Sequence, residues 1–344
     1  MQSKSLPQVF LGILAVLAIS AVLYLAAGVL IPLVTAILVS FIVSPVISFL
    51  HKRLHIPRPI AIFLVLLLVM TVVFLIGLFF YSSVQSFYRE LPKYSGKFTE
   101  ISLRLINRFR LPEDILEEFS WVRSMGSYLM AFSRGFVDFL SGLILMMLFL
   151  VFLLFERAHI RPKLWEAFES RTTHRLFVIY AHISRQIGRY LSVKLLVSVA
   201  TGFLMWLTLW IIGIEFAFVW GVLTFFFNFI PNIGAIILTA FIEVFAVLQF
   251  YPSPTEPIVA LVVMIVFQQV MGNLVEPALL GERLDLSPVV IIFSLVIWGW
   301  IWGILGMFLA VPLIVAIKIV LENIPFLKPA AVLMGTGKRL SSAS

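Results

Sequence analysis

NLVEPALLGERLDLSPVVIIFSLVIWGWIWGILGMFLAVPLIVAIKIVLE, residues 273–322, is the stretch whose breaks decide the fold. Two apolar arms flank a segment rich in glycine and tryptophan, Trp298–Gly303. As a helix, the first arm from Ser287 to Trp300 would be roughly 21 Å long, less than the ~30 Å hydrocarbon core of a bilayer. The second arm, Ile304 to Leu321, is just long enough to cross. This pattern predicts a re-entrant hairpin, whose irregular tip must be packed in protein or line a cavity.

The composition is that of a polytopic membrane protein. The chain has 344 residues, of which 62% are hydrophobic and 12% charged, and its mean hydropathy is +1.10. These values exclude a soluble globular domain, and the length accommodates about eight membrane-embedded segments. A net charge of +8 is explained by basic cytoplasmic loops, so nucleic acid is not an expected partner. The absence of cysteine excludes disulfides and thiolate chemistry.

The N-terminal half is expected to hold four spans around one polar interruption. Residues 1–81 read as N-terminal membrane helices, with spans at about 9–29, 31–50 and 59–81, and residues 135–155 as a fourth span. The basic loop His51–Arg58 indicates the cytoplasm, which also places the N-terminus there.

The polar interruption, residues 82–134, is predicted to form amphipathic extramembrane helices. Its apolar residues recur at heptad spacing, at Val84, Phe87, Leu91, Tyr94, Phe98, Ile101 and Leu105. Pro92 lies within this seam and is expected to kink or end a turn of the helix. A second helix is expected to begin near Pro112. The seam either packs against neighbouring spans or forms a contact between subunits.

Residues 156–190 are predicted to be a basic cytoplasmic linker helix. Between Glu156 and Lys194 eight basic residues stand against three acidic ones, an excess typical of the cytoplasmic side. An amphipathic helix with this charge suits the anionic surface of the inner leaflet.

The last part, residues 191–324, resembles a duplication. Repeat units at about 191–250 and 258–324 each contain a span followed by a hairpin with a glycine at its tip, and the first tip is Asn228–Gly234. Counting spans from the cytoplasmic linker gives the units opposite orientations and a cytoplasmic tail at residues 325–344. Inverted repeats are the plan of many secondary transporters. The alternative is two unrelated helical pairs with tight turns. The predicted fold is therefore an all-α polytopic membrane protein with about eight segments, two of them broken hairpins.

Polar groups near these breaks are the candidate site, because polar residues within a membrane are costly and mark function by default. On one helical face lie Gln269, Asn273 and Glu276, and on the 191–214 span Lys194, Ser198, Thr201, Met205 and Thr208 recur at helical spacing, with Gly202 permitting close approach. The candidate substrate- or ion-binding residues are Asn228, Pro231, Asn232, Gly234, Thr239, Glu243, Gln268, Gln269, Asn273, Glu276, Gly299, Gly303 and Gly306.

Each feature also has a purely structural interpretation. Glu276 could be solvated at the membrane interface, and the depth of Glu243 is not fixed by sequence. Lys318 and Glu322 are spaced as an ordinary interfacial pair. Trp298, Trp300 and Trp302 could be belt residues at an interface.

Enzymatic chemistry has little support in the sequence. The five histidines fall in predicted interfacial or cytoplasmic segments, without a metal-binding pattern, and no Walker A loop is present. No catalytic residue, metal or other cofactor is expected, and we predict that the protein is not an enzyme.

The motifs, taken in order, resemble the autoinducer-2 exporter family of prokaryotic membrane proteins. They are Phe229–Gly234, Gln268-Gln269, Asn273–Gly281, Leu286–Pro288 and Gly303–Leu313, with Ile31-Pro32 and Lys52-Arg53 extending the similarity over almost the whole chain. The resemblance implies an oligomeric inner-membrane transporter. Some members are linked to export of the signal autoinducer-2 and others to sodium/proton antiport.

These observations together predict a secondary transporter in the bilayer of the prokaryotic inner membrane, with both termini in the cytoplasm. It would export a small polar organic solute such as autoinducer-2 by alternating access, as a homo-oligomer. One alternative is a monovalent cation (sodium)/proton antiporter, in which Glu243 or Glu276 would titrate. A second is a structural or assembly membrane protein.

Overall fold

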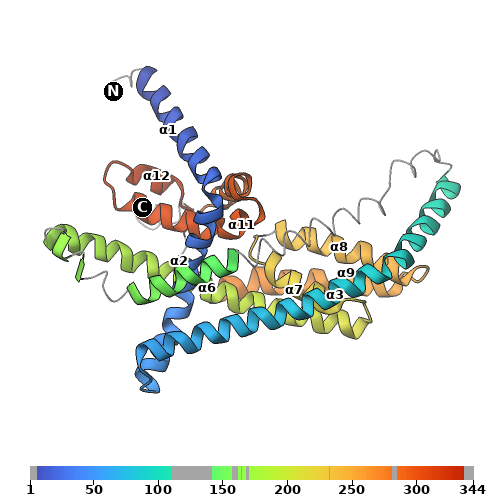
Figure 1. Cartoon of the computed structure of the whole chain (residues 1–344). Coiled ribbons are helices and arrows are strands. Elements are labelled where there is room, and N and C mark those ends of the chain that lie inside the picture. Colours follow the sequence, from blue (N-terminus) through green and yellow to red (C-terminus); the bar gives the residue numbers. More distant parts are fainter. Residues whose placement is uncertain are drawn as a thin grey trace. The chain divides into compact units, whose positions relative to one another are not determined.

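The structure, a computed structural model, describes residues 6–109, 142–156, 162–163, 165–167, 170–231, 233–280 and 285–336 (Figure 1). All regular structure in this part of the chain is helical. Within it, six helices are long and apolar enough to cross a membrane: Ala27–Arg53, Arg58–Phe87, Leu176–Ile212, Ile233–Phe250, Thr255–Leu280 and Pro288–Glu322. The predicted all-α polytopic membrane fold is confirmed. The chain divides into two compact units.

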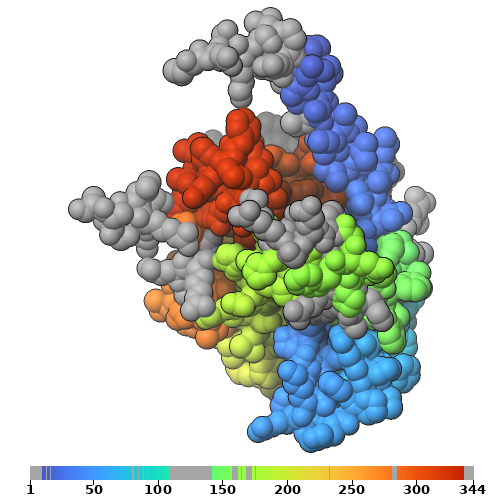
Figure 2. All heavy atoms as spheres, turned by 90° about the vertical axis from the view of Figure 1, so that its left-hand side faces the viewer, coloured from blue at the N-terminus to red at the C-terminus, as the bar shows by residue number. Residues whose placement is uncertain are grey.

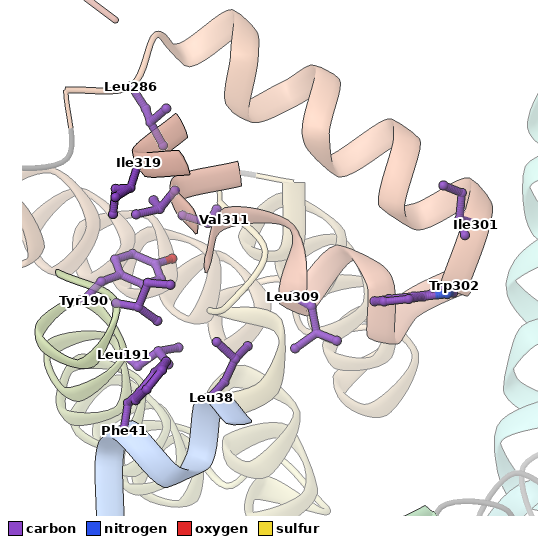
Figure 3. Packing of buried hydrophobic residues seen from close by; sticks show 12 residues of the cluster. Leu38, Phe41, Tyr190, Leu191, Leu286, Ile301, Trp302, Leu309, Val311 and Ile319 are labelled. Carbon is purple, nitrogen blue, oxygen red and sulfur yellow. The ribbon is translucent and has the colours of Figure 1, made fainter. Parts of the chain in front are cut away.

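Unit 1 comprises the described residues of 1–65, 140–192 and 280–344. It contains α1 (Leu6–Leu25), α2 (Ala27–Arg53), the helix Gly142–Glu156, α11 (Pro288–Glu322) and α12 (Lys328–Leu333). Figure 2 shows α1, in dark blue, beside the orange and red C-terminal helices, and α1 packs on both α2 and α11. The core of this unit joins α2 and the first part of α6 (Ser170–Ile212) to α11 (Figure 3).

Helix α11 folds back on itself, as the sequence predicts. Gly303 has a φ of 64° and a ψ of −146°, so the backbone leaves the helical conformation between the two arms. Ser294 on the first arm donates a hydrogen bond of 3.0 Å to the carbonyl of Ala310 on the second. In Figure 3, Ile301 and Trp302 lie at the turn, whereas Leu286 and Ile319 lie together at the opposite end. We call these two arms hairpin 2.

Unit 2 comprises the described residues of 66–139 and 193–279. It holds most of α3 (Arg58–Phe109), the second part of α6, α7 (Ala217–Phe227), α8 (Ile233–Phe250) and α9 (Thr255–Gln268). A π-helix, η1 (Gln269–Val275), and the short α10 (Glu276–Leu280) follow α9. Helices α7 and α8 contact each other across the predicted tip and form hairpin 1.

Both hairpins close around a glycine at the start of the returning arm. A Cβ atom built on Gly234 would lie 2.0 Å from the carbonyl oxygen of Phe227, and one built on Gly306 would lie 1.9 Å from that of Trp298. Real Cβ atoms never come so close to an oxygen, so any side chain would force the arms apart.

Helix α3 continues past residue 81, where the sequence predicts the span to end, and Pro92 does not end it. It runs unbroken from Arg58 to Phe109, with Pro92 inside it. A proline removes one helical hydrogen bond, but tertiary contacts can offset that loss. Lys93 forms an ion pair of 2.8 Å with Glu215, and Tyr94 is buried in the core of unit 2. These contacts with the base of hairpin 1 lie directly after the proline and can offset its lost hydrogen bond.

Two residues of the predicted heptad seam on α3, Phe87 and Tyr94, pack within unit 2. Phe87 and Tyr94 both contact Phe245 of α8, with ring centroids 6.1 and 4.8 Å apart. This bears out the packing interpretation for these two residues. The second amphipathic helix expected near Pro112 lies outside the described residues.

Helix α6 joins two elements that the sequence analysis separates. The described part of the basic linker from Ser170 continues without a break into the apolar span and ends at Ile212. The predicted 156–190 linker is therefore helical from Ser170 onward and continuous with the span that follows it.

Candidate functional site

A line of buried polar side chains runs along the apolar part of α6. Lys194, Ser198 and Thr201 recur at spacings of four and three, and their exposed fractions are 3%, 0% and 3%. We call these three residues the polar face of α6. They lie in a helix that is apolar enough to span a membrane, where polar groups are costly unless they are paired.

Lys194 is paired with Glu276. Its ammonium nitrogen lies 2.7 and 2.8 Å from the two carboxylate oxygens, and the Glu276 side chain is 17% exposed. Bringing two charges out of water is unfavourable, and only close, well-directed hydrogen bonds offset the cost. Within this chain Glu276 is therefore paired and mostly buried, and not a freely solvated carboxylate.

The π-helix η1 positions Glu276. The Glu276 amide donates to the carbonyl of Met271, five residues earlier, instead of the usual four. Pro277 follows and has no N–H group to donate to the carbonyl of Asn273. The wider π-helical turn therefore lies where one α-helical backbone hydrogen bond is already missing. Short π-helices occur frequently at functional sites.

The π-helix also separates the three polar residues predicted to share one face. Asn273 donates to the side chain of Gln269, and both are exposed within the chain. Glu276 instead turns toward Lys194. Gln268 is half-buried at the end of α9.

The tip of hairpin 1 reaches the same polar face. Asn228 follows α7, and its side-chain amide donates a hydrogen bond of 2.9 Å to the Ser198 hydroxyl. Close packing makes this possible, because a Cβ atom on Gly202 would lie 2.8 Å from the carbonyl oxygen of Gly221 in α7. The predicted role of Gly202 in close approach is confirmed. The site thus joins α6, the hairpin tip and α10.

The other candidate residues of hairpin 1 that the structure describes form no hydrogen bond with Lys194 or Glu276. Pro231 is half-buried in the tip, Gly234 is buried at the start of α8, and Thr239 is half-buried further along α8. Asn232 lies outside the described residues. One carboxylate oxygen of Glu243 is fully buried and accepts no hydrogen bond from the described residues.

Gly299, Gly303 and Gly306 belong to hairpin 2 in unit 1. Gly299 faces Met307 of the opposite arm, Gly303 forms the reversal and Gly306 permits the close approach. Trp302 is buried and donates a 2.9 Å hydrogen bond to the carbonyl of Leu23, so it is not an exposed belt residue.

Lys318 forms the expected pair with Glu322, but it is also buried and has a closer partner in Asp285. It lies 3.0 Å from a carboxylate oxygen of Asp285 and 3.8 Å from one of Glu322. Asp285 also accepts hydrogen bonds from the backbone and hydroxyl of Thr336. Partial burial raises the pKa of Asp285, but the hydrogen bonds from Thr336 and Lys318 outweigh it and lower that pKa to about 2. This cluster joins the base of hairpin 2 to the segment after α12.

The sequence indicates Glu276 as a candidate site residue but does not indicate its pairing with Lys194. The available signal was a lysine in the apolar span, at helical spacing from Ser198 and Thr201. Their separation of 82 residues gave no local pattern that could pair the two charges.

Comparison with known proteins supports the same class of protein. Residues 13–326 match the model of the AI-2E transporter family. A putative transport protein of Borreliella burgdorferi is 33% identical over 98% of this chain and 92% of its own length. The putative transport protein YhhT of Escherichia coli is 30% identical over 96% of this chain and 95% of its own. The AI-2 transport protein TqsA of Escherichia coli is 27% identical over 87% of each chain. The chain therefore belongs to the AI-2E transporter family and is a multi-pass membrane transporter.

Proposed function

We propose that this transporter is a secondary exporter of a small polar organic solute, with autoinducer-2 as the candidate to test first. The observation that carries the proposal is the buried Lys194–Glu276 pair beside the contact between Asn228 and Ser198. Charges placed within an apolar helix bundle mark solute or ion pathways by default.

The chemistry of this site suits a neutral, oxygen-rich solute. Lys194 offers donors, Glu276 offers acceptors, and the Asn228 amide offers both. Because the two charges cancel, a neutral molecule with several hydroxyl groups can bind without a net charge entering the membrane. The relative TqsA is named an AI-2 transport protein, which makes autoinducer-2 the first substrate to examine.

The proposed mechanism is alternating access by the hairpin units. In both hairpins a glycine, Gly234 or Gly306, lets the two arms pack closely. This similarity supports an inverted repeat, in which broken helices carry the site. Within unit 2, the moving contact would be that between the tip of hairpin 1 and α6. Solute hydroxyl groups would replace the bond between Asn228 and Ser198 as the tip separates from that helix.

The same proposal places the protein in the prokaryotic inner membrane as a homo-oligomer, with both termini in the cytoplasm. The basic loop at His51–Arg58 and the basic residues before Lys194 support this orientation. Large apolar side chains are exposed along α1 and along the apolar part of α3, where they could contact lipid or another subunit.

A second candidate function is monovalent cation (sodium)/proton antiport. The observation that favours it is the buried, unbonded carboxylate oxygen of Glu243. A carboxylate in an apolar helix is a suitable group to exchange a proton for a cation.

Transport into proteoliposomes distinguishes the two functions. Uptake of labelled autoinducer-2 would be measured beside an internal pH dye, with and without sodium, for wild type, Glu276→Gln and Glu243→Gln. Glu256→Gln is the matched control, because Glu256 lies at the other end of the same candidate span, next to Ser253. Solute uptake lost only in Glu276→Gln supports the exporter. Sodium-stimulated proton flux lost in Glu243→Gln supports the antiporter. Folded Glu276→Gln protein with full uptake would overturn the role given to the ion pair.

A further inference from the structure

Two neighbouring pockets in unit 1 share one wall on α2. The first, of about 390 Å³, is lined by Phe41, Ser44, Pro45, Ser48, Ser184, Arg185, Gly188, Arg189 and Ser192, and we call it pocket A. The second, of about 270 Å³, is lined by Ser44, Ile47, Ser48, His51, Lys52, Arg58, Ile62 and Leu154, and we call it pocket B. Ser44 and Ser48 line both. The volume of pocket A is that of about a dozen water molecules, at roughly 30 Å³ each.

The charged groups of both pockets are exclusively cationic among the described lining residues. Pocket A has two arginines one helical turn apart, Arg185 and Arg189, and pocket B has Lys52 and Arg58. None of these four side chains forms an ion pair with another described residue. Arginine forks and serine hydroxyl groups are the donors that bind phosphate oxygens.

The cations lie where apolar helices end. Lys52 is in the last turn of α2, Arg58 is the first residue of α3, and Arg189 directly precedes the apolar part of α6. This is the level at which a bilayer places its headgroups, and basic pockets between spanning helices recognise anionic ones.

The apolar surroundings favour a lipid over a soluble anion. Pocket A includes Phe41 and Pro45 beside its arginines, and pocket B includes Ile62 and Leu154. Large apolar side chains on the same helices are exposed nearby, at Val46, Phe49, Ile60 and Phe63. A phosphate with acyl chains would contact both kinds of surface, whereas free phosphate would leave the apolar surface in contact with water.

We propose that pockets A and B form a binding site for the phosphate-bearing headgroup of an anionic phospholipid. Arg185 and Arg189 bind the phosphate in pocket A, and Lys52 and Arg58 bind a second phosphate or the next lipid in pocket B. The site is separate from the Lys194–Glu276 pair and adds a lipid partner to the transporter.

The test uses the full-length protein in detergent and titrates it with cardiolipin, phosphatidylglycerol, phosphatidylcholine or inorganic phosphate. Binding would be followed by native mass spectrometry and by thermal stabilisation. Wild type is expected to prefer the anionic lipids. The double substitution Arg185→Gln/Arg189→Gln should weaken their binding roughly 30-fold, or about fivefold for each arginine.

Arg53→Gln is the matched control. Arg53 is exposed beside Lys52 on the same helix end, but it lines neither pocket. Little change in Arg53→Gln supports a defined site, whereas an equal loss would show general surface attraction and overturn the proposal. Equal binding of phosphatidylcholine, or displacement of the lipid by millimolar inorganic phosphate, would also overturn it. These two measurements need only wild-type protein, so a variant that fails to fold does not prevent the test.

Discussion

Lys194 and Glu276, 82 residues apart in the sequence, meet as a closely bonded ion pair with hydrogen bonds of 2.7 and 2.8 Å. The lysine side chain is almost fully buried, so water cannot replace Glu276 as the partner of its ammonium group. Removing one partner leaves the other buried without its counter-charge, so a single substitution should destabilise the protein more than replacement of both residues.

Glu276→Gln should destabilise the protein by about 3–5 kcal/mol, because the Lys194 amine would stay buried without its charged partner. The double substitution Lys194→Met/Glu276→Met should recover most of that stability but no transport, since apolar residues can replace the packing of the pair but not its hydrogen bonds. Thermal unfolding in detergent and uptake into proteoliposomes measure the two effects. A double variant as unstable as the single one would show that the pair does not act as a unit.

Asn228→Ala and Ser198→Ala should each reduce transport, and together they should reduce it no further than either alone. Each change removes the same 2.9 Å hydrogen bond between the tip of hairpin 1 and α6. Such a double-mutant cycle isolates the pair from the rest of the site. Additive losses in uptake would show that the two side chains act separately. Thr208→Ala, on the same helix, is the control.

Gly234→Ala and Gly306→Ala should both fail to form a stable hairpin. The added methyl group would lie about 2 Å from a backbone carbonyl in each case, and a backbone cannot yield as a flexible side chain can. Gly96→Ala is the matched control, because a Cβ atom there meets nothing within 4 Å. In a helix interior this control should be neutral or up to about 1 kcal/mol more stable. Expression and thermal unfolding in detergent measure all three, and a normal transition in Gly306→Ala would contradict the packing described.

Acid should weaken the anchor at the base of hairpin 2. The pKa of Asp285 is about 2 in the folded protein, below an ordinary aspartate value of about 3.9. The lowered pKa contributes stability that is fully present above pH 4 and is lost as the pH falls toward 2. Thermal unfolding of wild type should therefore change over this window more than that of Asp285→Asn, which should be less stable already at pH 7. Parallel curves for the two proteins would argue against this anchor.

The hairpins were predictable because their signals are local. A short apolar arm, a glycine-rich tip and a returning arm stand together in the sequence, and the reversal at Gly303 lies within the predicted break. The tip of hairpin 1 begins at Asn228, also as predicted.

The partners in the site were harder to predict, because they depend on contacts between distant segments. The pairing of Lys194 with Glu276 requires knowledge of which helices are neighbours. The turn of Glu276 away from Asn273 depends on the π-helix, whose wider turn the residue spacing does not reveal. For the same reason the sequence does not show that α3 continues past Pro92, where Lys93 and Tyr94 contact the base of hairpin 1.

The attachment of α3 to hairpin 1 has a consequence for biosynthesis. Lys93 and Tyr94 bond to Glu215, and Lys97 bonds to the carbonyl of Gln249, so these partners emerge from the ribosome 121–152 residues after the helix itself. At about 5–20 residues per second, that interval lasts roughly 6–30 s. During this interval Lys93, Tyr94 and Lys97 lack these partners. The polar end of α3 must therefore stay helical without them until hairpin 1 has been synthesised.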